Sequence, residues 1–210
     1  MHVFGIQGCE EPFSPLPRCA SMTDACITCI EDLRDFFSAS TAVELRDAAT
    51  RIAASVDAVI SPDTDWTTVE YEFNRLFVGP AAVPAPLYAS AYCESDRVVM
   101  GKAALEARQL YHQLGLTVPQ EGVIPDDHLA FELEAMIVLK SALGADAPPS
   151  PETKALHAWF VREHLARWLP PFILATRTHA SAGGVIALAA DALAAWFDKE
   201  LNTTAPPLPE

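Results

Sequence analysis

The chain has 210 residues, half of them hydrophobic, and carries 28 acidic against 14 basic side chains, a formal net charge of −14. This length suits one domain or two small lobes with a sizeable core, and the acidity argues against nucleic acid, whose binding depends on neutralised phosphates. No apolar run reaches the ~18 residues of a membrane span and no secretory signal is recognisable, so we expect a cytoplasmic protein.

Helical periodicity and capping signals organise the first half of the chain. Residues 1–20 carry three prolines and no period, so we expect a loose N-terminal segment. Capping boxes beginning at Thr41 and Thr67 open two of the helices, and Gly79 with Pro80 ends the second of these. The predicted helices of this half cover about residues 22–38, 42–60, 67–78 and 101–114.

The second half is also predicted to be helical. A helix begins after Asp127 and ends near Gly144, and Pro170 with Pro171 is predicted to end another helix. The remaining helices cover about residues 152–168, 171–180 and 185–201, and a frayed tail covers 203–210.

No strand and no repeat is predicted, so the fold class is an all-α bundle of about eight helices. The segment from Thr117 to Pro125 reads as a hinge between two lobes. The N-terminal helical lobe then covers residues 21–124 and the C-terminal helical lobe covers 125–202.

The sequence Pro125-Asp-Asp-His128 at the start of a helix has two interpretations. Asp is a preferred N-cap, and acidic side chains near a helix N-terminus are stabilised by the macrodipole. One Asp is enough for that role, and a histidine in the first turn is mildly disfavoured as a cation. The segment is therefore either a cap on a solvated surface or a small polar site on the hinge.

Four short motifs occur in a characteristic order. A helix ends with LFVGP at Pro80, a P-x-P-x-Y-x-S loop runs from Pro84 to Ser90, a helix that begins at Gly101 ends with Gly115-Leu116, and PDDH-x-x-x-E-L begins at Pro125. This order, over about residues 70 to 139, resembles the TorD/DmsD family of cytoplasmic chaperones, also called redox enzyme maturation proteins.

The resemblance implies a chaperone for a molybdenum-cofactor oxidoreductase and no catalytic activity of its own. Such a protein binds the twin-arginine leader of the precursor and holds the apoenzyme until cofactor insertion and before Tat export. It implies a monomer or a domain-swapped dimer with an Asp-His pair on the hinge. Here Asp126 stands where the family usually has proline, and Tyr88 stands where it often has tryptophan. GTP binding, ascribed to some relatives, has no phosphate loop to support it in this sequence.

The leader offers an apolar stretch and two guanidinium groups. Aromatic and aliphatic side chains could pack the apolar part, and carboxylates could pair with the guanidinium forks. The net negative charge of the chain suits such a partner. The alternative is that this charge only keeps the protein soluble. The predicted leader-binding residues are Phe77, Pro86, Leu87, Tyr88, Tyr92, Gly101, Glu121, Pro125, Asp126, Asp127 and His128.

Other classes of function find little support. Cys26 and Cys29 form a single CxxC, whereas structural zinc usually takes two such pairs, so we expect free thiols. His128 and Glu132 are four residues apart, but a bundle di-metal site needs a second such pair. No nucleotide-binding or hydrolase signature appears, so we predict no enzyme, no metal and no cofactor. The alternative is a generic helical peptide-binding or adaptor module without a redox client.

Overall fold

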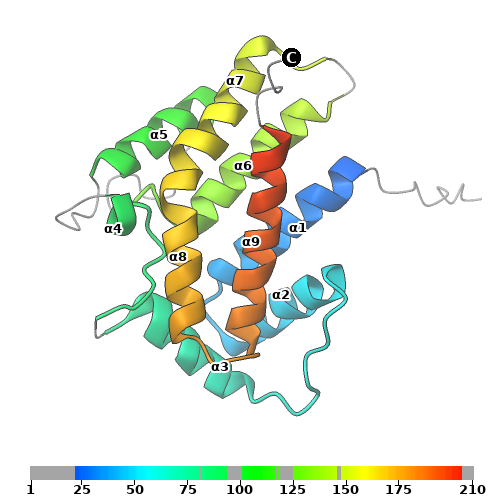
Figure 1. The fold of residues 1–210 in the computed structure, drawn as a ribbon, viewed down its shortest axis with the longest axis vertical. Coiled ribbons are helices and arrows are strands. Elements are labelled where there is room, and N and C mark those ends of the chain that lie inside the picture. Colours follow the sequence, from blue (N-terminus) through cyan, green and yellow to red (C-terminus); the bar gives the residue numbers. More distant parts are fainter. Residues whose placement is uncertain are drawn as a thin grey trace, which may run out of the picture.

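The computed structural model describes residues 22–80, 82–93, 101–116, 118, 125–145 and 148–204, and this part of the chain is built from helices (Figure 1). The α-helices are α1 (Met22–Phe37), α2 (Ala42–Ser55), α3 (Trp66–Phe73), α4 (Ser90–Cys93), α5 (Lys102–Leu114), α6 (Leu129–Leu143), α7 (Pro151–Trp159), α8 (Ala166–His179) and α9 (Val185–Thr203), and the π-helical turns are η1 (Asn74–Val78) and η2 (Phe160–Leu165).

The helices join into eight continuous helical segments within the described residues, because α3 runs into η1 and α7 runs through η2 into α8. The all-α prediction is therefore confirmed. The short helix α4 was not predicted, and it lies at the end of the P-x-P-x-Y-x-S loop. Within the same residues, no helix is both long and apolar enough to cross a membrane.

The bundle is held by one hydrophobic core. Helix α1 packs against α6 and α2, and α8 lies beside α9, which also contacts α1 and α2 (Figure 1). The core includes aromatic side chains from both halves of the chain, with Phe37 in edge contact with Phe77 and Phe172. The two predicted lobes therefore share a core, and the division at residues 124 and 125 stays a prediction. Most of the predicted hinge and residues 1–20 lie outside the described residues.

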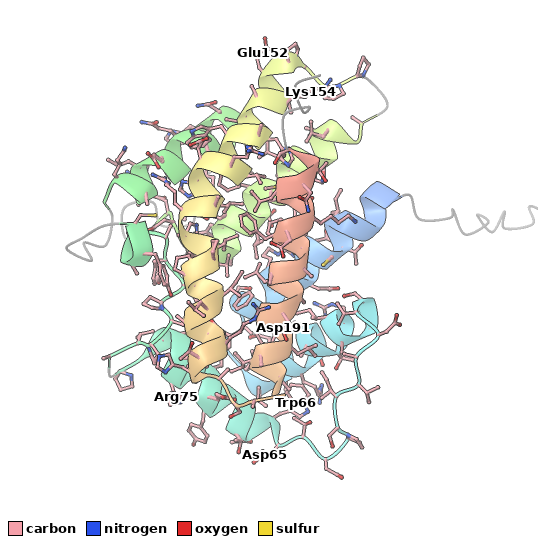
Figure 2. The ribbon with its side chains drawn as sticks, in the orientation of Figure 1. Asp65, Trp66, Arg75, Glu152, Lys154 and Asp191 are labelled. Carbon is pink, nitrogen blue, oxygen red and sulfur yellow. The ribbon has the colours of Figure 1, made fainter. Side chains whose placement is uncertain are left out.

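One of the two predicted capping boxes is present. The Thr41 hydroxyl and the Glu44 side chain bond to each other's backbone N–H groups at the start of α2. At α3 the prediction was wrong, because Asp65 is the cap and accepts from the backbone N–H of Thr67 (Figure 2). The Glu70 carboxylate is thereby left for the first N–H of α2.

The predicted break at Pro170 and Pro171 was also wrong, since both prolines lie inside α8. A proline in a helix interior frees the carbonyl four residues before it, here those of Ala166 and Arg167. Both prolines lie on the exposed side of the helix. The freed carbonyls can therefore be hydrated, and the helix continues.

Candidate functional site

The P-x-P-x-Y-x-S loop and the PDDH turn lie against each other. Tyr88 and His128 form an isolated antiparallel bridge. On either side of it, the Leu129 N–H donates to the Leu87 carbonyl at 2.9 Å and the Ala89 N–H donates to the Asp127 carbonyl at 3.0 Å. The structure therefore brings together two motifs that are about 40 residues apart in the sequence.

Asp127 is the anchor of this pairing. Its side chain is fully buried, and one carboxylate oxygen accepts from the backbone N–H of Ser90, the first residue of α4, at 2.6 Å. The other oxygen is buried with no hydrogen-bond partner among the described residues. The carboxylate faces inward and holds the loop on the turn.

Asp126 is also buried, with 1% of its surface exposed, and it already has a guanidinium partner. Arg108 of α5 donates to its carboxylate, with Nε at 2.8 Å from Oδ2. The Tyr111 hydroxyl donates to its backbone carbonyl at 2.8 Å. Asp126 thus fastens the turn to α5, while Glu121, the third predicted carboxylate, lies outside the described residues.

His128 is the N-cap of α6, a role that sequence reasoning gave to an aspartate. Its Nδ1 accepts from the Ala130 N–H at 3.1 Å, which requires a neutral ring with its proton on Nε2. Burial lowers the pKa of His128 from 6.5 to about 4. The ring packs on Tyr88 and on Phe131, with centroid distances of 5.1 and 5.7 Å.

His128 is expected to stay neutral in the folded protein at pH values where an ordinary histidine is protonated. Its folded-state pKa lies below the unfolded value, so this contribution to stability is complete above pH 6.5 and is lost as the pH falls towards 4. The full loss is roughly 3 kcal/mol by linkage. Chemical denaturation between pH 7 and 4 would measure it. The variant His128→Asn, which keeps a capping acceptor, should lack this part of the slope, and equal slopes would contradict the assignment.

An apolar hollow of about 310 Å³ opens beside the paired motifs. We call it the loop hollow, and it is lined by Leu87 and Tyr88 of the loop, by His128, Ala130 and Phe131 at the start of α6, by Phe73 and Val78 near η1, and by Phe37, Ser38 and Ala39 at the end of α1. Three of the predicted binding residues therefore line one hollow.

The other predicted residues lie elsewhere. Phe77 is buried in the aromatic core, and Tyr92 stacks on Trp168. Gly101 is the N-cap of α5, and Pro86 and Pro125 are half-buried neighbours of the paired segments.

Sequence reasoning missed Phe131 and the end of α1. Phe131 lies three residues after His128, so the helical period of α6 could have placed both on one face. The contribution of Phe37, Ser38 and Ala39 depends on packing between distant segments, and no local pattern predicts it.

A buried polar cluster lies behind the paired motifs. Glu132 of α6 contacts His164 of η2, with Oε1 at 2.7 Å from Nε2, and accepts from the Trp168 indole N–H at 3.0 Å. All three side chains are fully buried. Burial raises the pKa of Glu132, and the adjacent carboxylate raises the pKa of His164 against the opposing effect of burial.

Glu132 therefore pairs with His164 and not with His128, the partner considered for it in a metal site. Among the described residues, no group of three His, Cys, Asp or Glu side chains is arranged to hold a metal ion. Cys29 is a half-buried cysteine on α1, whereas the side chain of Cys26 lies outside what the structure describes. The predicted absence of a resident metal stays a prediction.

Comparison with known proteins gives a consistent set of similarities. A family model described as the nitrate reductase delta subunit matches residues 38–174, more than half of the chain. The chaperone protein TorD of Aliivibrio salmonicida is 25% identical over 131 residues, 61% of this chain and 61% of the relative. The Tat proofreading chaperone DmsD of Salmonella typhi is 31% identical over 101 residues, 48% of this chain and 45% of the relative.

The chain thus spans between about half and three fifths of the length of these curated relatives. Both are named as chaperones and not as enzymes, in agreement with the prediction of no enzymatic activity. A crystal structure from Archaeoglobus fulgidus, described as a proposed redox enzyme maturation protein, superposes with a TM-score of 0.54. It is 22% identical, covers 87% of this chain and 94% of its own, and shows the same fold.

Proposed function

We propose a function that follows from two findings. The chain belongs to the nitrate reductase delta subunit family, and it is similar to the TorD and DmsD chaperones. In this proposal the protein is a chaperone in the maturation of a redox enzyme. It binds the unfinished enzyme in the cytoplasm and releases it once it is complete.

The client that fits best is the catalytic subunit of a molybdenum-cofactor oxidoreductase that carries a twin-arginine leader. The loop hollow carries this proposal, because it is an apolar cavity at which two of the four motifs behind the family resemblance meet. An apolar stretch of a leader can bury its side chains there against Leu87, Tyr88 and Phe131. The net charge of −14 favours a basic partner.

The buried carboxylates take a supporting part in this proposal. Asp127 fixes the loop that carries Tyr88, and Asp126 fixes the turn that carries His128. Both carboxylates are buried and already hydrogen-bonded within the chain. We therefore expect a leader to contact the loop hollow and not these carboxylates.

The purified protein is expected to bind a twin-arginine leader peptide, with an affinity that falls as salt rises. Attraction between exposed charges is screened over ~10 Å at 0.1 M salt. A leader with two lysines in place of the arginines should bind more weakly, because an ammonium group lacks the bidentate fork. Isothermal calorimetry at two salt concentrations measures both effects. Equal, salt-independent binding of the two peptides would contradict pairing between the guanidinium groups of the leader and carboxylates of the protein.

The alternative is a helical peptide-binding module without a redox client. Affinity capture from the native cytoplasm, with mass spectrometry of the bound proteins, separates the two. A molybdoenzyme precursor among the captured proteins supports the chaperone, and a diverse set of unrelated peptides supports the alternative.

A further inference from the structure

Ser38 lies where three hollows meet, at the C-terminal end of α1. The loop hollow is one of them. A second, which we call the α5 hollow, has a volume of about 310 Å³ and is lined by Tyr111, Leu116, Val118 and Phe131, among others. The third, the acidic hollow, has about 340 Å³ and is lined by Asp35, Ser38, Ala39, Glu44, Asp47 and Arg51.

We propose that these three hollows form one composite docking site for a peptide that combines apolar side chains with a pair of arginines. The apolar side chains fill the loop and α5 hollows, and the guanidinium groups lie in the acidic hollow. This inference rests on the proposed function. It goes further by assigning the arginines to Glu44 and Asp47 and not to the buried carboxylates of the PDDH turn.

The loop and α5 hollows share three of their lining residues. Ser38, Ala130 and Phe131 line both of them. Two of these side chains are small, so a peptide backbone can pass over them while its side chains enter on either side of the Phe131 ring. Leu116, at the Gly-Leu helix end, and Val118 beyond it extend the apolar lining.

Most of the charged side chains that line the acidic hollow are carboxylates. Three carboxylates line it against one guanidinium, that of Arg51. Arg51 is already paired, with Nε at 2.5 Å from Asp32 and Nη2 at 2.7 Å from Asp35. Asp35 is held by Arg34, which lines the α5 hollow, as well as by Arg51. Glu44 and Asp47 are therefore the carboxylates that remain for an arginine pair, and carboxylates accept guanidinium forks in bidentate geometry.

The carboxylates of Glu44 and Asp47 are exposed to solvent. The Glu44 side chain is exposed, and hydrogen bonds from Ser40 and Thr41 lower its pKa, which keeps it charged. Asp47 is 54% exposed and is bonded only to its neighbour Arg46 among the described residues. The hydrogen bonds to Glu44 all use Oε2, so its Oε1 can accept from an incoming cation while the capping box stays intact, and the exposed Asp47 can turn to one.

The substitution Ser38→Trp tests the composite site, because an indole there obstructs all three hollows at once. Ser38 is exposed and its hydroxyl makes only a 3.3 Å contact to the Asp35 carbonyl, so the fold should tolerate the change. Ser141→Trp is the matched control, since Ser141 is an exposed serine whose hydroxyl also bonds a backbone carbonyl. Leader affinity measured by calorimetry should fall at least tenfold in Ser38→Trp and stay at the parent value in Ser141→Trp.

Equal binding by both folded variants would overturn the composite site and leave the proposed function standing. A parent protein that does not bind the leader would overturn both. If Ser38→Trp melts below the parent, the smaller substitution Ser38→Leu is compared instead, with at least a threefold loss expected.

The position of the arginines is tested by a double-mutant cycle. The variant Asp47→Asn should lose at least threefold in affinity for the Arg-Arg leader and almost nothing for a Gln-Gln leader. Asp63→Asn, an exposed acid outside the three hollows, controls for net charge. An equal loss for both leaders, or the same coupling at Asp63, would overturn the assignment.

Discussion

Glu132→Ala is expected to lower the free energy of unfolding by about 3–5 kcal/mol, the range for removing one partner of a buried charged pair. Its carboxylate is fully buried between His164 and the Trp168 indole. Alanine leaves both ring N–H groups buried without their acceptor, and it opens a cavity. Urea denaturation at neutral pH, with far-UV circular dichroism as the signal, measures the loss.

The conservative variant Glu132→Gln separates the hydrogen bonds from the packing. Glutamine fills the same volume and its oxygen can still accept from Trp168, so its loss should be clearly smaller than that of alanine. Equal losses would show that the charged contact with His164 accounts for the loss, and that packing and the Trp168 hydrogen bond contribute little. Tyr92 of α4 stacks on Trp168 at a centroid distance of 6.0 Å, so we also expect near-UV dichroism to report a disturbed loop in the alanine variant.

Asp127→Ala is expected to destabilise the protein by about 2–3 kcal/mol and to abolish leader binding. Hydrogen bonds to charged groups contribute ~1.5–3 kcal/mol, and the buried Ser90 N–H loses its acceptor. The loop that carries Tyr88 then loses its side-chain anchor and keeps its backbone hydrogen bonds to Asp127 and Leu129 and the ring contact between Tyr88 and His128. Thermal melts beside calorimetric titrations measure the two effects.

Asp127→Asn shows whether this residue acts as an anchor or touches the leader. Asparagine keeps an oxygen that can accept from Ser90, so an anchor predicts near-parent stability and near-parent leader affinity. A residue that pairs directly with an arginine predicts a folded asparagine variant that binds poorly. That second outcome would return the guanidinium groups to the PDDH turn.

The helices could be predicted from sequence wherever a period and a cap agree. Thr41 and Glu44 form the predicted box, and the helix that follows begins where expected. At Pro170 and Pro171 a local rule failed, because exposure of the freed carbonyls decides whether a helix survives two prolines, and exposure is a tertiary property.

The candidate site was predictable only in part. The motifs indicated Leu87, Tyr88 and His128, which do line one hollow. The sequence could not show that Asp126 meets Arg108, because that pairing depends on how α5 packs beside the turn. Nor could it show that Ser38, about 90 residues before the PDDH turn, lies at the junction of three hollows.

A competing hollow exists at the α3 end of the molecule, near Asp65 and Asp191 (Figure 2). It has a volume of about 540 Å³, is lined by residues that fall within 58–72 and 181–191, and contains none of the family motifs. Volume alone would favour it over the loop hollow, so the test of the account must distinguish the two places.

Photo-crosslinking makes that distinction most directly. A twin-arginine leader with a photoreactive residue in its apolar stretch is irradiated with the parent protein, and the attached residues are mapped by mass spectrometry. We expect attachment at Tyr88, Phe131 or Leu116, and competition by unlabelled leader. Attachment confined to residues 58–72 or 181–191, or attachment that unlabelled leader does not reduce, would contradict this expectation.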